Sequence, residues 1–243
     1  MSGQRRSLVI TDLTRLKSEG DTVCTAGIDL ETGESLRPYP YFTKDFCSKH
    51  GIVPGVKISA SFAPTLNKAA PHTEDSLCNN LDVDGPVSSE NFREVLRKYS
   101  VTSLDDGFRA SLPRWEKRFP KDTPPPVSLA TLQVKPDQIH LHPGQNAGSI
   151  RLNLGGSGRG PINDIPITDL RFHALLSQNP PDESFIELNR ELHRKAEVFL
   201  RVGLGRCYTN QQGKEGYWIQ INGLYTFPEK LSTLPRDPFS NLA

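Results

Sequence analysis

Proline is the residue that most restricts how this chain can fold, because 20 of its 243 residues are prolines. Proline lacks a backbone N–H and fixes φ, so it interrupts helices and the central strands of sheets. Many short segments joined by turns are therefore expected. Three consecutive prolines at 124–126 favour an extended polyproline conformation. We predict a connector at residues 122–126 between a first half, residues 1–121, and a second half, residues 127–243.

Short apolar runs bounded by turn residues predict β-strands in both halves. In the first half they cover residues 8–10, 22–28 and 56–62, and Gly33 is expected to supply the positive φ of a hairpin turn after the second run. In the second half they cover residues 127–134, 138–142, 149–154, 198–204 and 217–225. The sequence thus predicts a mainly β fold, a β-rich α+β protein.

Helical periodicity is concentrated in two places. Apolar residues recur at helical spacing from Phe92 to Tyr99, with Ser88 or Ser89 placed to act as the N-cap. A second and longer helix is predicted to start near Asp182, where the same spacing follows two prolines.

One four-residue motif occurs twice. Ile-Thr-Asp-Leu stands at residues 10–13 and again at 167–170, and each copy is followed later by a β run and a hairpin. We interpret this as a duplicated small β unit, whose two halves can be interleaved in space. The Thr-Asp pairs at 11–12 and 168–169 are expected to be helix N-caps.

The charge and apolar composition exclude several classes of protein. Lys and Arg total 29 against 28 for Asp and Glu, so the net charge of +1 supplies no global field to attract nucleic acid, and any such surface must be a local patch. No run of about 20 apolar residues is present to span a bilayer, and the start of the chain lacks the apolar stretch of a signal peptide. Four scattered cysteines fit a reducing compartment. These features predict a cytoplasmic protein without a membrane partner.

No motif of catalysis or metal binding stands out. The Walker and Gly-x-Ser-x-Gly patterns are absent, and the glycine-rich residues 155–160 are interpreted as a flexible connector. Cys47, His50, His72 and Cys78 are zinc-ligand types, but their spacing is irregular. We expect a non-enzyme with no catalytic residue, no metal and no cofactor.

Two segments combine cations with aromatic rings, as binding of single-stranded nucleic acid requires. In the first, Arg37, Tyr39 and Tyr41 alternate, so on an extended chain all three would project to the same side. The alternative is that prolines order this loop and the tyrosines pack on the protein.

The second segment, residues 93–121, holds eight basic and four acidic side chains, a local balance of +4. Its candidate binding residues are Arg114, Trp115, Lys117 and Arg118. A solvated helix face is the alternative explanation for these charges.

Several motifs together resemble the prokaryotic dual-OB-fold domain family. They are Ile-Thr-Asp-Leu-Thr-Arg at 10–15, Cys-Thr-Ala-Gly-Ile-Asp at 24–29, Leu-Arg-Pro at 36–38, Pro-His-Thr-Glu-Asp at 71–75 and Asn-Gly-Leu-Tyr-Thr-Phe at 222–227. The resemblance implies two OB-type β-barrels and a nucleic-acid role linked to bacterial defence or genome maintenance, and it brings no catalytic residue. We expect two such barrels with two or three accessory helices.

The functional expectation is a non-catalytic module that binds single-stranded DNA or RNA within a prokaryotic defence or DNA-processing complex. Arg171, which follows the second Ile-Thr-Asp-Leu, joins the candidate binding residues. Two alternatives stay open: a protein-interaction scaffold for a multi-component enzyme, and a sensor of a small nucleotide.

Overall fold

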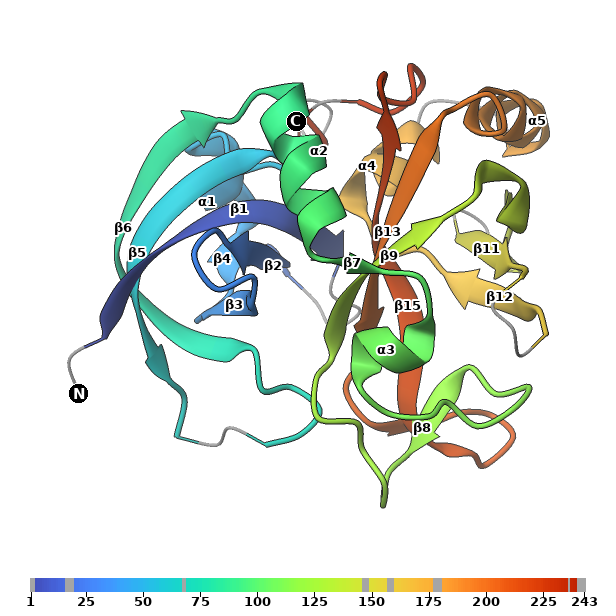
Figure 1. The fold of residues 1–243 in the computed structure, drawn as a ribbon, viewed down its shortest axis with the longest axis horizontal. Coiled ribbons are helices and arrows are strands. Elements are labelled where there is room, and N and C mark those ends of the chain that lie inside the picture. The colour runs from blue at the N-terminus through green and yellow to red at the C-terminus, as the bar shows by residue number, and fades with distance from the viewer. Residues whose placement is uncertain are drawn as a thin grey trace.

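Strands of the first half close into a five-stranded barrel in the computed structural model, which describes residues 3–15, 20–66, 69–145, 149–156, 160–176, 181–235 and 237–239 (Figure 1). Its strands are β1 (Gln4–Arg15), β2 (Thr22–Asp29), β3 (Ser35–Tyr39), β5 (Val56–Pro64) and β6 (Asp75–Pro86). They follow the order β1–β2–β3–β6–β5 and return to β1, with β3 and β6 parallel and the other pairs antiparallel.

The second half repeats this strand order. Its first strand is split into β9 (Leu129–Val134) and β10 (Ile139–Pro143) by the short 3-10 helix η1 (Pro136–Gln138). The other strands are β11 (Ile150–Leu154), β12 (Ile162–Pro166), β13 (Glu197–Leu204) and β15 (Glu215–Phe227). β10 pairs with β11, β11 with β12, β15 with β13 and β13 with β9, while a parallel bridge from Ile167 to Ile221 joins the end of β12 to β15.

Both barrels therefore have the order first–second–third–fifth–fourth, with a parallel contact between the third and fifth strands. Helices enter both at the same place, between the third and fourth strands: α1 (Lys44–Lys49) in the first barrel, and α4 (Leu170–Leu176) and α5 (Pro181–Leu192) in the second. The chain is mainly β and consists of two five-stranded Greek-key barrels of OB type. This confirms the expected fold class.

The segment between the barrels contributes to the second one. It contains α2 (Ser89–Lys98), β7 (Ser100–Val101), α3 (Leu104–Phe108) and β8 (Arg118–Pro120). β7 pairs with β9, and β8 pairs with β15. Two short strands complete the set: β4 (Phe42–Thr43), which pairs with β2, and β14 (Tyr208–Thr209), which pairs with β15. The strands β7 and β8 precede the predicted division at residues 122–126, yet they pair with strands of the second barrel.

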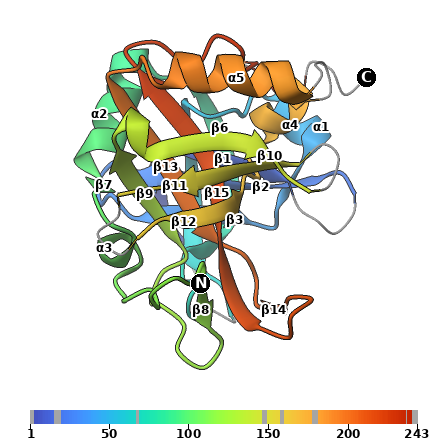
Figure 2. The same ribbon diagram turned by 90° about the vertical axis from the view of Figure 1, so that its right-hand side faces the viewer.

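The barrels are joined by an apolar interface under α2, which crosses between them in Figure 1. Phe92 and Leu96 of α2 pack with Val9 and Ile28 of the first barrel, and with a group of aromatic side chains of the second: Phe199, Tyr225 and Phe227. The Tyr225 hydroxyl donates a 2.5 Å hydrogen bond to the carbonyl of Thr11 across the interface. Seen from the side, α5 lies at one end of the molecule, and β8 and β14 at the other (Figure 2).

The predicted strands and both predicted helices are present at nearly the expected residues, and Ser88 caps α2. Gly33 has φ 77° in the hairpin turn between β2 and β3. Strands β6 and β12 were not predicted, because polar residues alternate with isolated apolar ones there and both strands are partly exposed. The central residues of the predicted 155–160 connector, 157–159, lie outside the described residues.

The repeated Ile-Thr-Asp-Leu motif does not mark equivalent positions in the two barrels, although the barrels share one strand order; only its use as a marker of the repeat was wrong. The first copy lies inside β1, and the second follows β12 and enters α4. The end of β1, just after the first copy, contacts the second copy, since the N–H of Arg15 donates to the carbonyl of Thr168 at 2.9 Å. Asp169 accepts a hydrogen bond from the N–H of Arg171 at the start of α4, as an N-cap does, whereas Asp12 belongs to a strand and caps no helix.

No helix formed by the described residues is both long and apolar enough to cross a membrane.

Candidate nucleic-acid interface

A groove of about 410 Å³ lies at the end of the second barrel where β8 meets the β14–β15 hairpin. It is lined by Trp115, Glu116, Lys117, Pro161, Ile162, Asn163, Asn210, Gln212, Lys214 and Trp218. Trp115 is 68% exposed although it is a large apolar side chain. Exposed aromatic rings in a groove provide surfaces on which bases can stack.

The cations in and beside this groove lie near aromatic rings or pair with carboxylates. The Arg114 guanidinium lies 5.4 Å from the centre of the Trp115 ring, and that of Arg118 lies 6.0 Å from the Trp218 ring. Lys117 pairs with Asp164 at 3.0 Å, and Lys214 pairs with Glu116 at 2.8 Å. Exposed ion pairs of this kind contribute about 0–1 kcal/mol, so a phosphate can replace the carboxylate at little cost.

Tyr39 and Tyr41 form the other predicted aromatic pair. Tyr39 ends β3 and is 45% exposed, and its ring meets that of Tyr41 edge-on with centroids 5.8 Å apart. The Tyr41 hydroxyl accepts a 2.9 Å hydrogen bond from Arg206, which lies between β13 and β14. The tyrosine pair of the first barrel therefore contacts a loop of the second barrel through Tyr41.

The loop at 205–214 connects the two predicted segments. Arg206 at its start contacts Tyr41, and Tyr208, two residues later, packs on Trp218 with ring centroids 5.6 Å apart. Contacts run from Tyr39 and Tyr41 to Arg206, the chain leads from Arg206 to Tyr208, and further contacts join Tyr208 to Trp218 and Trp218 to Arg118. We call the following residues the aromatic–basic surface: Tyr39, Tyr41, Arg114, Trp115, Lys117, Arg118, Arg206, Tyr208, Lys214 and Trp218.

Two predicted binding residues lie inside the protein. Arg37 is 5% exposed, pairs with Asp75 at 2.5 Å and donates to the Ser128 hydroxyl at 3.2 Å. Arg37 and Tyr39 lie on the same face of β3, but Arg37 is covered by its contacts with Asp75 and Ser128, whereas Tyr39 stands at the exposed end of the strand. Arg171 is also buried; it pairs with Asp169, donates to the carbonyl of Leu224 and lies over the Tyr225 ring.

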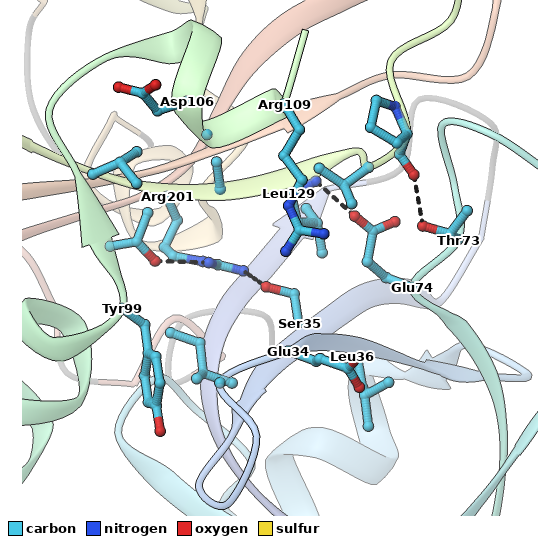
Figure 3. A pocket seen from close by; sticks show the side chains of 18 residues that line it. Glu34, Ser35, Leu36, Thr73, Glu74, Tyr99, Asp106, Arg109, Leu129 and Arg201 are labelled. Carbon is cyan, nitrogen blue, oxygen red and sulfur yellow. Dashed lines mark hydrogen bonds between the residues drawn. The ribbon is translucent and has the colours of Figure 1, made fainter.

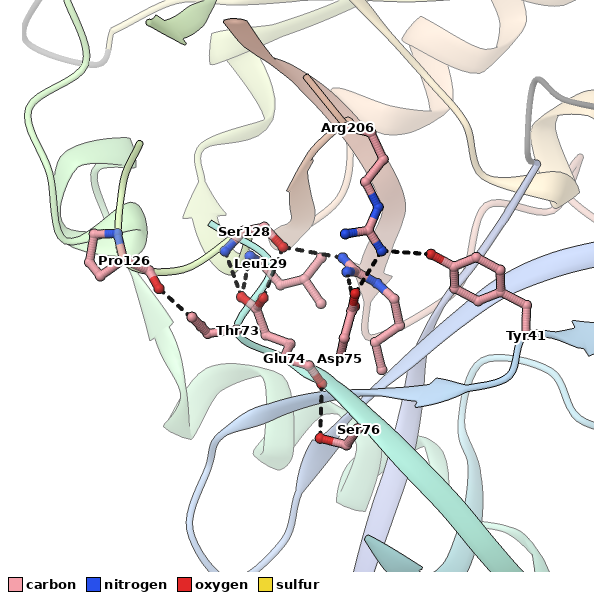
Figure 4. Close-up of polar contacts among 10 residues, drawn as sticks. Tyr41, Thr73, Glu74, Asp75, Ser76, Pro126, Ser128, Leu129 and Arg206 are labelled. Atoms are coloured by element: carbon pink, nitrogen blue, oxygen red, sulfur yellow. Dashed lines mark hydrogen bonds and ion pairs between the residues drawn. The ribbon is translucent and has the colours of Figure 1, made fainter. Parts of the chain in front are cut away.

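The polar contacts around Glu74 and Asp75 tie the barrels together (Figure 4). The Glu74 carboxylate accepts hydrogen bonds from the N–H groups of Ser128 and Leu129 and from the Ser128 hydroxyl, at 2.6–2.9 Å. Asp75 pairs with both Arg37 and Arg206. Burial acts to raise the pKa of Asp75, but the two guanidinium groups outweigh it and the pKa is lowered.

His72 lies at the same junction. It is buried, and its ring meets that of Tyr217 edge-on at 6.0 Å. Burial, followed by the positive charges of Arg206 and Arg37, lowers the pKa of His72 to about 3. His72 is therefore neutral at physiological pH and adds no positive charge to the junction.

Four residues of the aromatic–basic surface were missed in the sequence: Arg206, Tyr208, Lys214 and Trp218. From the sequence, the segment from 205 to 214 is predicted only as a turn, and Trp218 is predicted as part of a core strand. The one available signal was the alternation of basic and aromatic side chains on both sides of the turn at 210–213. Within the described ranges, no three His, Cys, Asp or Glu side chains are grouped closely enough to hold a metal ion.

No family model matches the chain, and no curated protein matches it. Among solved structures, it is similar to the HINa domain of Ifi202 in complex with a 20-bp double-stranded DNA, at 10% identity and a TM-score of 0.34 over 92% of this chain and 98% of that one. It is also similar to a replication protein A heterotrimer bound to single-stranded DNA, at 10% identity and a TM-score of 0.38 over 91% of this chain and 49% of that one. These matches are too distant to support a conclusion about this chain, and the OB-type assignment rests on the strand order of its own two barrels.

Proposed function

We propose that this chain is a non-catalytic module that binds single-stranded DNA or RNA along the aromatic–basic surface. The observation that carries the proposal is the set of contacts that places Tyr39 and Tyr41 against Arg206 and, two residues further along the same loop, Tyr208 against Trp218. It brings exposed and half-buried rings and cations from both barrels together.

The position of this surface suits the fold. OB-type barrels bind oligonucleotides on the face of their second and third strands and with the loop that joins the fourth strand to the fifth. In the second barrel β12 is the third strand, and residues 205–214 form the fourth-to-fifth loop. Ile162 and Asn163 from β12, and Asn210 and Lys214 from that loop, line the groove next to Trp115.

The chemistry of the surface also suits a single strand. Stacking of a base on an aromatic ring contributes about 1–3 kcal/mol, and the bases of a single strand are accessible for it. Basic side chains bind the phosphates of the same strand. Arg37 and Arg171 belong to the predicted site, but their burial and internal ion pairs leave them a supporting role. Membership of a prokaryotic defence or DNA-processing complex stays a prediction.

Fluorescence anisotropy with short single- and double-stranded oligonucleotides at two salt concentrations tests the proposal. Wild type should bind single strands, and binding should weaken as salt rises. Trp115→Ala should lower affinity about tenfold without unfolding, because the ring is exposed. Ile186→Ala is the matched control: Ile186 is 62% exposed, on α5 at the opposite end of the molecule.

Absence of binding to every oligonucleotide would overturn the proposal. Equal losses in the Trp115 and Ile186 variants would instead remove the aromatic–basic surface from the binding site. Preference for duplex over single strands would overturn the single-strand assignment.

A further inference from the structure

A second cavity, of about 370 Å³, lies between the two barrels and apart from the aromatic–basic surface (Figure 3). Ser35 and Glu74 line it from the first barrel, and Thr131 and Arg201 line it from the second. Arg109, at the end of α3, lies in the segment that connects them. Its volume is in the range of pockets that hold small molecules, about 300–1,000 Å³.

Arg201 is a fully buried cation in the wall of this cavity. Its Nε pairs with Asp12 at 2.8 Å, Nη1 donates to the Thr131 hydroxyl at 2.8 Å, and Nη2 donates to the Ser35 hydroxyl at 3.1 Å. Each terminal nitrogen carries two N–H groups, so one donor on each remains beyond these bonds. The guanidinium is held rigidly, and Ser35 and Thr131 place two hydroxyls beside it.

Arg109 is a second cation, and its side chain projects toward the cavity in Figure 3. Among the described residues its guanidinium forms no hydrogen bond or ion pair, in contrast to Arg201. Its backbone has φ 55° and ψ 33° at the C-cap of α3. Glycine adopts this left-handed conformation more readily than arginine does, so the helix end itself does not require an arginine here.

The carboxylates that line the cavity are already engaged. Glu74 accepts three hydrogen bonds from Ser128 and Leu129. Glu34 pairs with Arg6 at 2.9 Å, and Asp106 accepts from the Ser103 hydroxyl at 2.6 Å. Among the described residues, Arg109 is therefore the one charged side chain lining the cavity that has no hydrogen bond or ion pair.

The aromatic wall does not provide a stacking surface. A Cβ atom at Gly33 would lie 2.2 Å from Cε1 of Tyr99, so the Gly33 backbone closely covers that ring. The Lys98 ammonium lies 4.9 Å from the ring centre. The features that remain for a ligand are two guanidinium groups and two hydroxyls, which suit an oxyanion.

We propose that the cavity between the barrels binds the phosphate group of a small phosphate monoester. Arg109 contacts the phosphate from the solvent side, and Arg201, with the Ser35 and Thr131 hydroxyls, contacts it from the buried side. The volume leaves room for an organic group beside the phosphate. This site is independent of nucleic-acid binding on the aromatic–basic surface.

Isothermal titration calorimetry with adenosine monophosphate, adenosine and inorganic phosphate tests the proposal. Adenosine monophosphate should bind, adenosine should not, and inorganic phosphate should compete with the monophosphate if the phosphate alone is recognised. Arg109→Gly should weaken binding at least tenfold while the melting temperature stays equal or rises, because glycine relieves the left-handed backbone. Arg97→Ala, an exposed arginine on α2, is the control and should bind as wild type does.

Failure of both phosphate compounds to bind the wild-type chain would overturn the site. Binding that is unchanged in Arg109→Gly would also overturn it, because the ligand would then lie elsewhere. Oligonucleotide anisotropy on Arg109→Gly separates the two proposals: its affinity should equal that of wild type whichever result the calorimetry gives.

Discussion

Arg201 of β13 and Asp12 of β1 form an ion pair across the two barrels, with 2.8 Å between Nε and Oδ2 and with each side chain 1% exposed. The residues are 189 positions apart in the chain. A buried charge without its partner costs several kcal/mol. Asp12 of the first barrel and Arg201 of the second therefore neutralise each other only while the two barrels are packed together.

Replacement of Arg201 alone should destabilise the protein severely. Arg201→Met should lower the free energy of unfolding by about 3–5 kcal/mol, because the Asp12 carboxylate is left buried and unpaired. Urea denaturation measures the change. The Asp12→Leu, Arg201→Met double variant should recover much of the loss, and a single variant that loses less than about 1 kcal/mol would contradict this account.

Alanine and phenylalanine variants of Tyr39 and Tyr41 should distinguish a contribution of ring stacking to affinity from a contribution of the hydroxyl groups. Alanine at either position should cost about 1–3 kcal/mol of single-strand affinity. Tyr39→Phe should bind as wild type does, because stacking needs the ring. Tyr41→Phe should bind slightly more weakly, since it loses the hydrogen bond from Arg206.

Melting temperatures of the same tyrosine variants provide the control. A core role would instead lower stability by about 3 kcal/mol or more in the alanine variants. A stable Tyr39→Ala, Tyr41→Ala double variant that keeps full affinity would exclude both rings from the interface.

Removal of Arg114, Lys117 and Arg118 together should weaken binding to all sequences alike. Three lost phosphate contacts should reduce the slope of log affinity against log salt by about 2 for single strands. Arg97→Ala, Lys98→Ala on α2 is the matched control and should leave the slope unchanged. Equal slopes in the triple variant and wild type, with folding intact, would assign these charges to solvent or to a protein contact.

His72 should make the protein less stable in mild acid. Its folded pKa of about 3 lies below the ordinary value of 6.5, so the unfolded chain takes up the proton first as the pH falls. The contribution is fully present above pH 6.5 and is lost between pH 6.5 and 3, at up to about 1.4 kcal/mol per pH unit.

Urea denaturation at pH 7 and pH 4.5 tests this effect above the range in which Asp75 titrates. His72→Leu should flatten the change in unfolding free energy between the two pH values. An equally steep change in the variant would place the acid sensitivity at another group.

Local sequence patterns predicted most of the secondary structure. The alternation around Ile219 and the spacing from Phe92 to Tyr99 identify a core strand and an amphipathic helix, and both form as expected. Such patterns predict structure because the apolar face of a strand or helix is formed by residues that are close together in the chain. They fail for β6 and β12, whose residues are partly exposed and whose strand character depends on neighbours that complete each barrel.

The candidate site was predictable only in part. The aromatic and basic residues at Tyr39, Tyr41 and Arg114–Arg118 could be recognised from the local composition of the sequence. The loop at 205–214, which connects the two segments, could not. Arg206 enters the surface because the second barrel's fourth-to-fifth loop lies against Tyr41, in the segment that follows β3 of the first barrel.

The sequence by itself determined the mainly β fold, the turn at Gly33 and the capped helix at Ser88, since each depends on the conformational preferences of a few neighbouring residues. Tertiary structure alone decided which arginines are buried and which are free. Arg37 and Arg201 look like any surface arginine in the sequence, yet each finds a carboxylate on a distant strand, whereas Arg109 finds none among the described residues. The partner of a charge is set by how two barrels pack, and that packing brings together residues whose separation along the chain carries no local signal.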